Sequence, residues 1–344
     1  MQLNPVSVDL SKSVFQLSIA DNAHNVLKRK RLSRPQFHRW LATTEPVHLV
    51  MEACATSNFW GRTASEFGHD VKLLHPRYVT PYVRRNKTDA ADADALIRAD
   101  LDSELKPVPI KSEHQQAIQG LHRVRQQWIG TRTARINTVR GLMAEYGVSL
   151  PRGISRIEQR LNDHLDQIPP LLAGALTLLV EEISQLGERT DDIDNQLKQL
   201  TADDPTTQRL TTMPGVAHIT ATALVGRVAD IHAFPRARSF ASWLGLTPGE
   251  HSSGQKRRLG SITRAGDSYL RVLLIHGARS ALLAAARKMR RGQRLTTLEI
   301  WGLDLAIRSG HNKAAVAMAN KMARTLWAMW TRGEDYVPRF ASAQ

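Results

Sequence analysis

The chain has 344 residues, of which 42% are hydrophobic, and it carries one cysteine and a net charge of +15 at pH 7. This length and composition exclude a disordered or fibrous protein and predict two or three domains, while the lone Cys54, expected to pack in a core, excludes a disulfide framework and a cysteine-based zinc cluster. No secretory signal is recognisable and the longest uncharged apolar run, residues 171–180, is too short to cross a membrane, so we expect a cytoplasmic protein without a membrane partner.

The first hundred residues alternate strand and helix signals. Their patterns predict strands at 6–9, 14–19, 26–30, 47–51 and 71–75, and helices at 35–43 and 58–67. The order β-β-β-α-β-α-β is that of a ribonuclease-H-like domain, an α/β layer fold. A further helix should follow Thr88, its N-cap, and end near Ala99.

Four acidic side chains lie where these elements could bring them together. Asp9 ends the first strand and Glu52 follows the fourth, while Asp89 and Asp92 project from one face of the last helix. Mg²⁺ prefers oxygen ligands, and in phosphodiester chemistry a bound metal ion activates the nucleophile and neutralises charge. Taken singly, each acid would more often cap an element or face solvent, so the prediction depends on their combination.

Other polar residues flank this acidic group. The basic stretch with Arg84, Arg85 and Lys87 precedes the helix, and it could hold a phosphate backbone or form an exposed loop. Asp94 is expected to point away from the acidic face, and Asp100 is expected to face solvent.

Residues 112–200 have the character of long helices. One helix is predicted at 112–146 and a break at 151–153, followed by apolar residues at steps of four and three. These residues are Leu172, Leu176, Leu179, Ile183, Leu186, Ile193, Leu197 and Leu200. The pattern predicts a helical arm or coiled coil, used for dimerisation or core packing, and residues 201–207 are predicted to form a linker.

The last third is helical and strongly basic. Residues 207–344 carry 21 basic and seven acidic side chains, whereas residues 1–106 carry 15 and 12. Such a field attracts a polyanion, so nucleic acid is the expected partner, although a basic face can also serve solubility alone. The turn Met213-Pro214-Gly215, before a predicted helix at 219–228, could contact a phosphate or be an ordinary turn.

A polar loop near residue 253 is rich in cations. The sequence Ser252-Ser253-Gly254 is ordinarily a turn, and His251 before it is either a general base or a solvated loop histidine. The cations that follow could hold a phosphate and lower the pKa of a hydroxyl. They are Lys256, Arg257, Arg258, Arg264 and Arg271. The tryptophans of this third are expected in the core.

Several blocks of the sequence resemble the DEDD transposases of insertion-sequence family one-ten. The first three are Val-Asp-Leu-Ser-Lys at 8–12, Met-Glu-Ala at 51–53 and Asn-Lys-Thr-Asp-Ala-Ala-Asp-Ala at 86–93. The C-terminal third is similar to that family's transposase domain at 213–215, 240–248, 252–254 and 264–271. Residues 310–320, which include Lys313, resemble the subgroup whose RNA is encoded upstream of the gene. The resemblance spans almost the whole chain, and Ala217 departs from it where many relatives carry a second glycine.

The resemblance implies an N-terminal Holliday-junction-resolvase-like fold and a serine nucleophile. The ligands of Mg²⁺, or of Mn²⁺, would be Asp9, Glu52, Asp89 and Asp92. Ser253 would attack a DNA phosphodiester, giving a covalent phosphoserine joint and a free 3′-hydroxyl before strand exchange and religation. Ser252 is the alternative if the register differs by one residue. The implied partners are a non-coding bridge RNA as guide, donor and target double-stranded DNA, and further copies of the chain in a dimer or tetramer.

The expected fold is therefore α/β followed by all-α. A ribonuclease-H-like domain would occupy residues 1–110, a helical coiled-coil arm 111–204, a helical transposase domain with the serine 205–335, and a tail 336–344. Nucleic-acid contacts are expected from Arg84, Arg85, Lys87, Lys256, Arg257, Arg258, Arg264, Arg271 and Lys313.

Two other functions fit many of the same residues. One is a junction-resolving nuclease that uses the four carboxylates and water, without serine chemistry. The other is a non-catalytic nucleic-acid-binding protein with a decayed nuclease fold. A metabolic kinase is disfavoured by the charge and by the missing glycine-rich phosphate loops.

Overall fold

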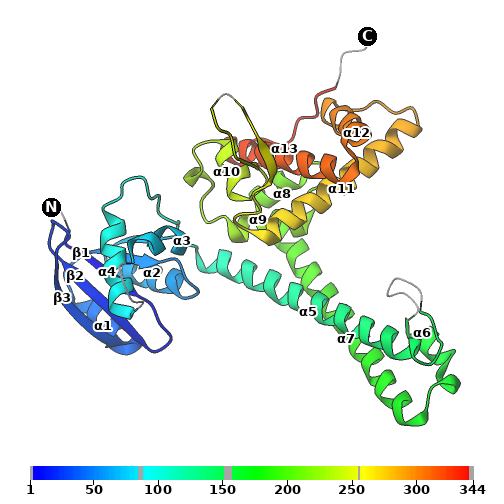
Figure 1. Cartoon of the computed structure of the whole chain (residues 1–344), viewed down its shortest axis with the longest axis horizontal. Helices are drawn as coiled ribbons and strands as arrows, with labels where there is room; N and C mark the ends of the chain where they lie inside the picture. Colours follow the sequence, from blue (N-terminus) through cyan, green and yellow to red (C-terminus); the bar gives the residue numbers. More distant parts are fainter. Residues whose placement is uncertain (1–2, 84–87, 151–156, 255, 341–344) are drawn as a thin grey trace. The chain divides into compact units, whose positions relative to one another are not determined.

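The computed structural model describes residues 3–83, 88–150, 157–254 and 256–340. The chain divides into two compact units, Met1–Glu113 and His114–Gln344 (Figure 1). Each unit has its own hydrophobic core, and each is described by itself below.

The first unit contains a five-stranded mixed sheet of order β3-β2-β1-β4-β5. Its strands are β1 (Pro5–Asp9), β2 (Val14–Ala20), β3 (Val26–Ser33), β4 (His48–Glu52) and β5 (Asp70–Leu74). β2 pairs antiparallel with β1 and β3, whereas β4 pairs parallel with β1 and β5. The predicted order of elements is confirmed, but β3 extends beyond its predicted end because Ser33 still pairs with Val14 of β2.

Helices cover both faces of this sheet. α1 (Arg34–Thr43) and α2 (Ser57–Glu66) pack Phe37 and Trp60 against one face. On the other face, α4 (Asp89–Asp100) packs Leu96 against Val50 of β4, near the short helices α3 (Pro76–Val79) and η1 (Thr80–Tyr82). The predicted cap of α4 is confirmed, because the Thr88 hydroxyl accepts a hydrogen bond from the Ala91 amide at 3.2 Å.

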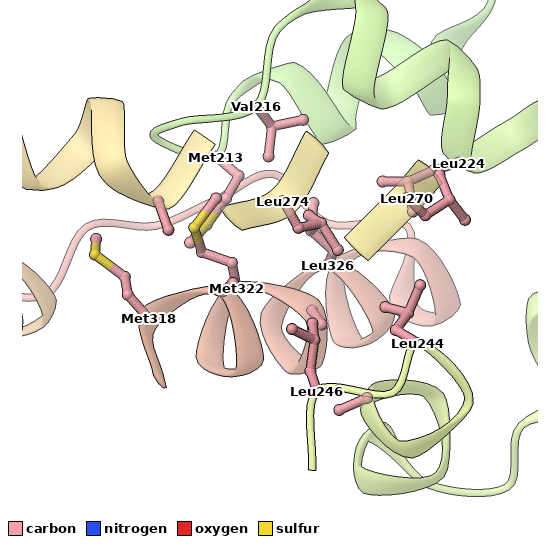
Figure 2. Packing of buried hydrophobic residues seen from close by; sticks show 14 of the residues in the cluster. Met213, Val216, Leu224, Leu244, Leu246, Leu270, Leu274, Met318, Met322 and Leu326 are labelled. Carbon is pink, nitrogen blue, oxygen red and sulfur yellow. The ribbon is translucent and has the colours of Figure 1, made fainter. Parts of the chain in front are cut away.

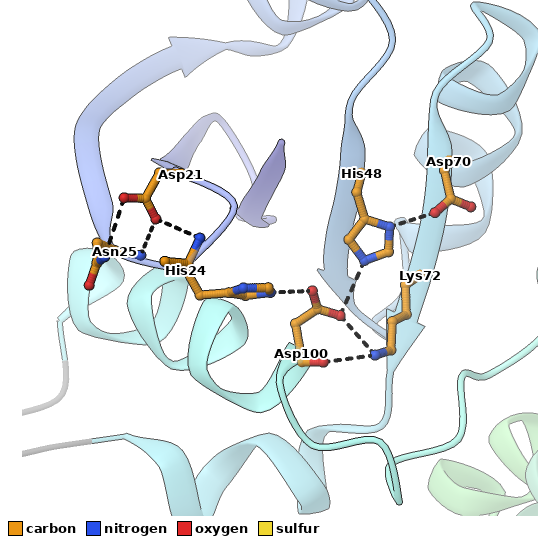
Figure 3. Close-up of polar contacts among 8 residues, drawn as sticks. Asp21, His24, Asn25, His48, Asp70, Lys72 and Asp100 are labelled. Carbon is orange, nitrogen blue, oxygen red and sulfur yellow. Dashed lines mark hydrogen bonds and ion pairs between the residues drawn. The ribbon is translucent and has the colours of Figure 1, made fainter. Parts of the chain in front are cut away.

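The C-terminal end of α4 is tied to the sheet through Asp100. Its carboxylate accepts from Lys72 Nζ at 2.8 Å and lies 3.2 Å from His48 Nε2 and 3.1 Å from His24 Nε2, while His48 Nδ1 lies 2.5 Å from Asp70 (Figure 3). The Asp100 side chain is only 5% exposed, so the prediction that it faces solvent was wrong. A buried carboxylate is stable only with such partners, and here they come from β4, from β5 and from the turn after β2.

Protonation of this cluster is coupled to folding. Burial raises the pKa of Asp100, but hydrogen bonds from His48 and Lys72 outweigh burial and hold that pKa well below its usual value. The hydrogen bond to Asp100 raises the pKa of His48 above its usual value despite the desolvation of the ring. The lowered carboxyl pKa stabilises the fold above about pH 4, and the raised histidine pKa stabilises it below about pH 6.5, with the latter contribution lost as pH rises through the folded pKa.

We expect His48→Gln to remove this upper pH dependence. Between about pH 6 and pH 8 the opening free energy of β4 and β5 in the wild type should fall by on the order of 1 kcal/mol more than in the variant. Hydrogen exchange of peptides covering the two strands measures this difference. His38→Gln, at an exposed histidine of the same unit, is the matched control and should follow the wild type. Identical pH dependence in His48→Gln and wild type would contradict the coupling.

The second unit begins with a helical arm. α5 (Glu113–Ala144) and α7 (Pro170–Asp203) run antiparallel, since Arg125 bonds Asp194 and Arg135 bonds Glu182. The short elements α6 (Ile157–Asn162) and η2 (Leu165–Gln167) join them. Much of the predicted apolar stripe is buried within the chain, at Leu176, Ile183, Leu186, Ile193 and Leu197.

The predicted linker at residues 201–207 is not a loop. α7 continues to Asp203, and α8 (Pro205–Thr211) starts directly after Asp204. Asp204 caps α8 by accepting hydrogen bonds from the Thr206 and Thr207 amides, so one residue changes the direction of the chain.

The rest of the second unit is a helical bundle that carries one β-hairpin. Its elements are α9 (His218–Arg227), η3 (Ile231–Ala233), α10 (Ala237–Trp243), β6 (Pro248–Glu250), β7 (Leu259–Ile262), α11 (Ser268–Arg290), α12 (Thr297–Ser309) and α13 (His311–Arg332). Leu274 of α11 and Leu326 of α13 meet in the core (Figure 2). The tryptophans predicted to be core residues pack against it, namely Trp243, Trp301, Trp327 and Trp330.

α11 is long and apolar enough, by length and composition, to cross a membrane. Arg271, Arg279 and Arg287 interrupt its apolar residues, so it contains no long uncharged run. In the structure Leu270 and Leu274 of this helix are buried in the core of the bundle (Figure 2), and so is Leu282. This packing accounts for its composition, so α11 does not indicate a membrane protein.

Two glycines allow the turn before α9 to touch α11. A Cβ added at Gly277 would lie 2.0 Å from the Gly215 carbonyl oxygen, and one added at Gly215 would lie 2.4 Å from that of Gly277. Gly215 also has a φ of 87°, which favours glycine. The predicted turn at Met213-Pro214-Gly215 is confirmed, and its contact with a phosphate stays a prediction.

We expect Gly277→Ala to destabilise the second unit, since two backbones must move apart to admit the methyl group. The free energy of unfolding should fall by about 1–3 kcal/mol. Gly174→Ala is the control, because nothing lies within 4 Å of its added Cβ. That change should leave stability unchanged or raise it by about 0.5–1 kcal/mol. Equal melting temperatures of the two variants in calorimetry would refute the close approach.

Candidate active site

Asp9 and Glu52 lie at the C-terminal ends of two neighbouring central strands of the first sheet. Val8 of β1 is paired with Met51 of the parallel strand β4, so the acids that follow leave the sheet at neighbouring positions. Side chains alternate along a strand, and Val8 and Met51 face the core under α1 and α2. Asp9 and Glu52 therefore project toward the opposite face, which α4 covers.

α4 brings Asp92 to the same region. The Ser7 hydroxyl donates to the Ala93 carbonyl at 2.6 Å, which fixes the start of the helix over β1. Asp89 and Asp92 share a helical stripe with Leu96, whose side chain packs toward β4. Asp92 is half-buried, whereas Asp89 is exposed at the first position of the helix.

Asp94 points elsewhere, as the helical spacing predicts. Its carboxylate accepts from Ser18 of β2 at 2.7 Å and from Arg29 of β3 at 2.6 Å. Burial raises the pKa of Asp94, but the bonds from Arg29 and Ser18 lower it below its usual value. Asp94 thus stabilises the fold.

Cys54 was expected in a core but is partly exposed in the turn after Glu52. Its amide donates a hydrogen bond to the Glu52 carbonyl at 2.8 Å.

The donor chemistry of Asp9, Glu52 and Asp92 fits Mg²⁺, which binds oxygen ligands. They come from three elements that register and hydrogen bonding hold over one face of the sheet. Within the described ranges, however, no three acidic, histidine or cysteine side chains form a ready-made metal site. The predicted contacts Arg84, Arg85 and Lys87 lie outside the described residues.

The predicted nucleophile lies at the tip of the serine hairpin, which comprises β6, β7 and the described residues between them, 251–254 and 256–258. The Ser252 hydroxyl donates to Glu250 at 2.7 Å and accepts from the Arg258 amide at 3.1 Å, so it is used to shape the loop. The bond from Ser252 and the nearby Arg257 lower the pKa of Glu250 below its usual value. Ser253 is exposed, and its carbonyl accepts from the Lys256 amide. No hydrogen bond of its hydroxyl is present among the described residues.

The predicted phosphate-binding cations of the second unit differ in their surroundings. Lys256, Arg257 and Arg258 are exposed on the serine hairpin, although Arg257 also lies 3.5 Å from Glu250. Arg264 is exposed beyond β7. Arg271 is partly buried and donates to the Leu244 and Ala265 carbonyls, so it holds the loop before α11 in place. Their contact with nucleic acid stays a prediction.

Sequence analysis did not single out Lys321 and Arg324. They share one face of α13 with Lys313, at a spacing typical of a helical stripe that also includes Val316, Ala317 and Asn320. The spacing of three and four residues between these side chains is the sequence signal that could have indicated a shared cationic face on this helix.

Two regions of the chain match known families. Residues 6–148 match the DEDD transposases of IS110 type, and residues 207–293 match the family described as "Transposase IS116/IS110/IS902 family". A "Probable family 20 transposase" of Pseudomonas aeruginosa is 37% identical over 98% of this chain and 100% of its own length. The transposase for insertion sequence element IS1111A of Coxiella burnetii is 36% identical over 96% of this chain and 90% of its own. That for element IS1328 of Yersinia enterocolitica is 36% identical over 95% and 97%.

This chain combines a mixed α/β unit, with acids at neighbouring strand ends, and a basic helical unit. Together with the family matches, this architecture identifies a transposase. The chain belongs to the IS110/IS116/IS902 family of insertion-sequence transposases, and DNA is its substrate.

We expect the cations of the serine hairpin to contribute to DNA affinity through phosphate contacts. Lys256→Gln with Arg258→Gln should reduce the slope of log affinity against log salt by up to about 2. Fluorescence anisotropy with duplex DNA from about 50 to 200 mM salt measures the slope. Arg189→Gln with Lys198→Gln, at exposed cations of α7, is the matched control and should not change it. An unchanged slope in the hairpin variant would exclude these contacts.

Proposed function

We propose that this transposase cuts and rejoins DNA through a covalent joint to Ser253. The observation that carries the proposal is the division of roles between two adjacent serines. Ser252 is bonded to Glu250 and to the backbone of Arg258, while Ser253 presents its hydroxyl at the tip of a cationic hairpin. Both serines are exposed, but the Ser252 hydroxyl already forms two hydrogen bonds within the loop, and this difference supports Ser253 as the nucleophile.

The proposed chemistry is a transesterification. The Ser253 oxygen attacks the phosphorus of a DNA phosphodiester, the bond from phosphorus to the 3′-oxygen breaks, and the leaving oxygen takes up a proton as a free 3′-hydroxyl. Lys256 and Arg258 would hold the phosphate and stabilise its added negative charge. The phosphoserine joint retains the energy of the broken bond, so religation to a new 3′-hydroxyl requires no ATP.

The acidic face of the first unit would hold Mg²⁺, or Mn²⁺. Its ligands would be Asp9, Glu52, Asp89 and Asp92, on a domain that we propose is ribonuclease-H-like and similar to Holliday-junction resolvases. When bound, the metal would neutralise charge at the phosphate and favour deprotonation of the serine hydroxyl. The placement of Asp9, Glu52 and Asp92 on one face of the sheet supports this assignment.

The proposal includes a guide and an assembly. A bridge RNA encoded upstream of the gene would select donor and target DNA by base pairing, while the protein binds the nucleic-acid backbone. Bringing two duplexes together requires at least a dimer, and we propose a tetramer on DNA with the helical arm, as a coiled coil, joining subunits. The charge of residues 207–344 supports a nucleic-acid complex.

A second candidate function is a metal-dependent junction nuclease without serine chemistry. It is favoured by one observation, that Asp9, Glu52 and Asp92 lie in a unit with its own core. Water would then be the nucleophile, and the basic unit would only hold DNA.

We expect a DNA strand to remain attached to the wild-type protein after denaturation. The reaction contains Mg²⁺, the flanking non-coding RNA of the element, and labelled donor and target DNA. Ser253→Ala should abolish the adduct, because the attacking oxygen is missing. Ser252→Ala should retain it, with a lower yield since the loop loses two hydrogen bonds. Cleavage without an adduct, equal in wild type and Ser253→Ala, would instead support the nuclease.

We expect Asp9→Asn and Glu52→Gln to lower adduct formation by about 100-fold or more, as metal chelation should. Binding of duplex DNA, measured by gel shift, should stay within about twofold, since the basic unit is unchanged. Glu66→Gln, at an exposed acid of α2, is the matched control and should retain full activity. Normal adduct yield in Asp9→Asn would exclude the proposed metal site.

A further inference from the structure

A cavity of about 750 Å³ lies between the serine hairpin and helices α12 and α13. Its apolar lining comes from Leu246, Pro248, Ile262, Val316 and Ala317. Ligand sites in proteins usually measure roughly 300–1,000 Å³ and combine an apolar lining with a few polar groups. The cavity therefore has the size and lining of a binding site, and neither the metal ligands nor Ser253 line it.

The cavity also has an excess of positive charge. Lys313, Lys321 and Arg324 line it, and its lining contains no acidic residue. In the described part of the chain, none of these three cations forms an ion pair with a carboxylate. Lys321 Nζ lies 3.6 Å from the centre of the Trp301 ring, and burial together with nearby Arg324 lowers the pKa of Lys321 below its usual value. Arg324 donates only to the Asn320 carbonyl and Lys321 contacts only an aromatic ring, so an anion would supply the negative charge that no described side chain gives these cations.

Two side-chain amides add hydrogen-bonding groups to the lining. Asn320 donates to the Leu246 carbonyl at 3.0 Å, which leaves its amide oxygen as an acceptor. Asn312 accepts from Arg279 at 3.1 Å, which leaves its amide N–H groups as donors. An apolar cavity with cations, one acceptor and a pair of donors matches a nucleotide, which combines a flat base, polar base edges and a phosphate.

We propose that this cavity binds one unstacked nucleotide of the DNA strand that the transposase cuts, an inference that rests on the proposed serine chemistry. Pro248 of the cavity and Ser253 belong to the same hairpin. Five residues span at most about 18 Å, which corresponds to roughly five nucleotides of a DNA strand. For a strand that runs directly from the tip of the hairpin to the cavity, the bound base lies within about five nucleotides of the phosphate that Ser253 attacks. This proximity favours DNA over RNA as the source of the nucleotide.

Photo-cross-linking tests the assignment. The full chain carrying Ser253→Ala, which keeps the strand intact, is mixed with its RNA and with donor or target DNA. The DNA carries 5-iododeoxyuridine at one position at a time, up to about five nucleotides on either side of the cut. After irradiation, mass spectrometry locates the attached nucleotide. We expect one position to attach to peptides from residues 297–324, which contain Trp301 and the cavity face of α13.

Two variants of cavity residues and one control variant show whether the cross-link depends on the cavity. Ala317→Phe fills the cavity without changing its charge, and Lys321→Met removes one cation. Each should lower the cross-link yield by about tenfold, in line with the contribution of one bound base. Arg308→Met, at an exposed cation of α12 outside the cavity, should retain the yield. Circular dichroism shows whether each variant folds, and if Ala317→Phe does not, Lys321→Met decides.

Cross-links that never map to residues 297–324, or that persist unchanged in both folded pocket variants, would overturn the proposal. Attachment only from iodouridine placed in the RNA would assign the cavity to RNA and would overturn it as well. A cavity cross-link in the absence of any Ser253-dependent joint would reject the serine chemistry and keep the nucleotide site. A Ser253-dependent joint without the cross-link would reject the nucleotide site alone.

Discussion

The parallel pairing of β1 with β4 determines where the acidic side chains of the first unit lie. Because Val8 is opposite Met51, Asp9 and Glu52 emerge at adjacent positions and on the face that α4 covers. A slip of either strand by one residue would turn its acid toward the apolar core under α1 and α2. The cap at Thr88 sets the start of α4, and the packing of Leu96 against Val50 of β4 determines which acids of this helix face the sheet.

In the second unit a closely packed helical core carries an exposed cationic hairpin. Its core is packed closely enough that the Gly215 turn meets α11 at Gly277, where no side chain fits. On this frame the serine hairpin is exposed, with Ser252 bonded into the loop and Ser253 at its tip. Most of the net positive charge lies in this unit. A rigid helical frame that presents an exposed cationic hairpin suits an enzyme that must bind DNA before it reacts.

Local signals allowed much of the fold to be predicted from the sequence. Alternating strands, helical spacing and the Thr88 cap depend on neighbouring residues, and the structure confirms them. The surroundings of Asp100 were not predictable, because its partners come from other elements and meet only in the folded sheet. The distinction between Ser252 and Ser253 also needed the structure, since it depends on the hairpin register that brings Glu250 and Arg258 beside Ser252.

The central claim is that one serine oxygen becomes bonded to DNA. The most direct measurement is tandem mass spectrometry of the adduct formed by the wild-type protein, after proteolysis and nuclease digestion, to locate the residue that carries the nucleotide. We expect a nucleotide linked through its 5′-phosphate to the oxygen of Ser253. A linkage at Ser252 or at any other residue, or cleaved DNA with no linked peptide, would contradict it.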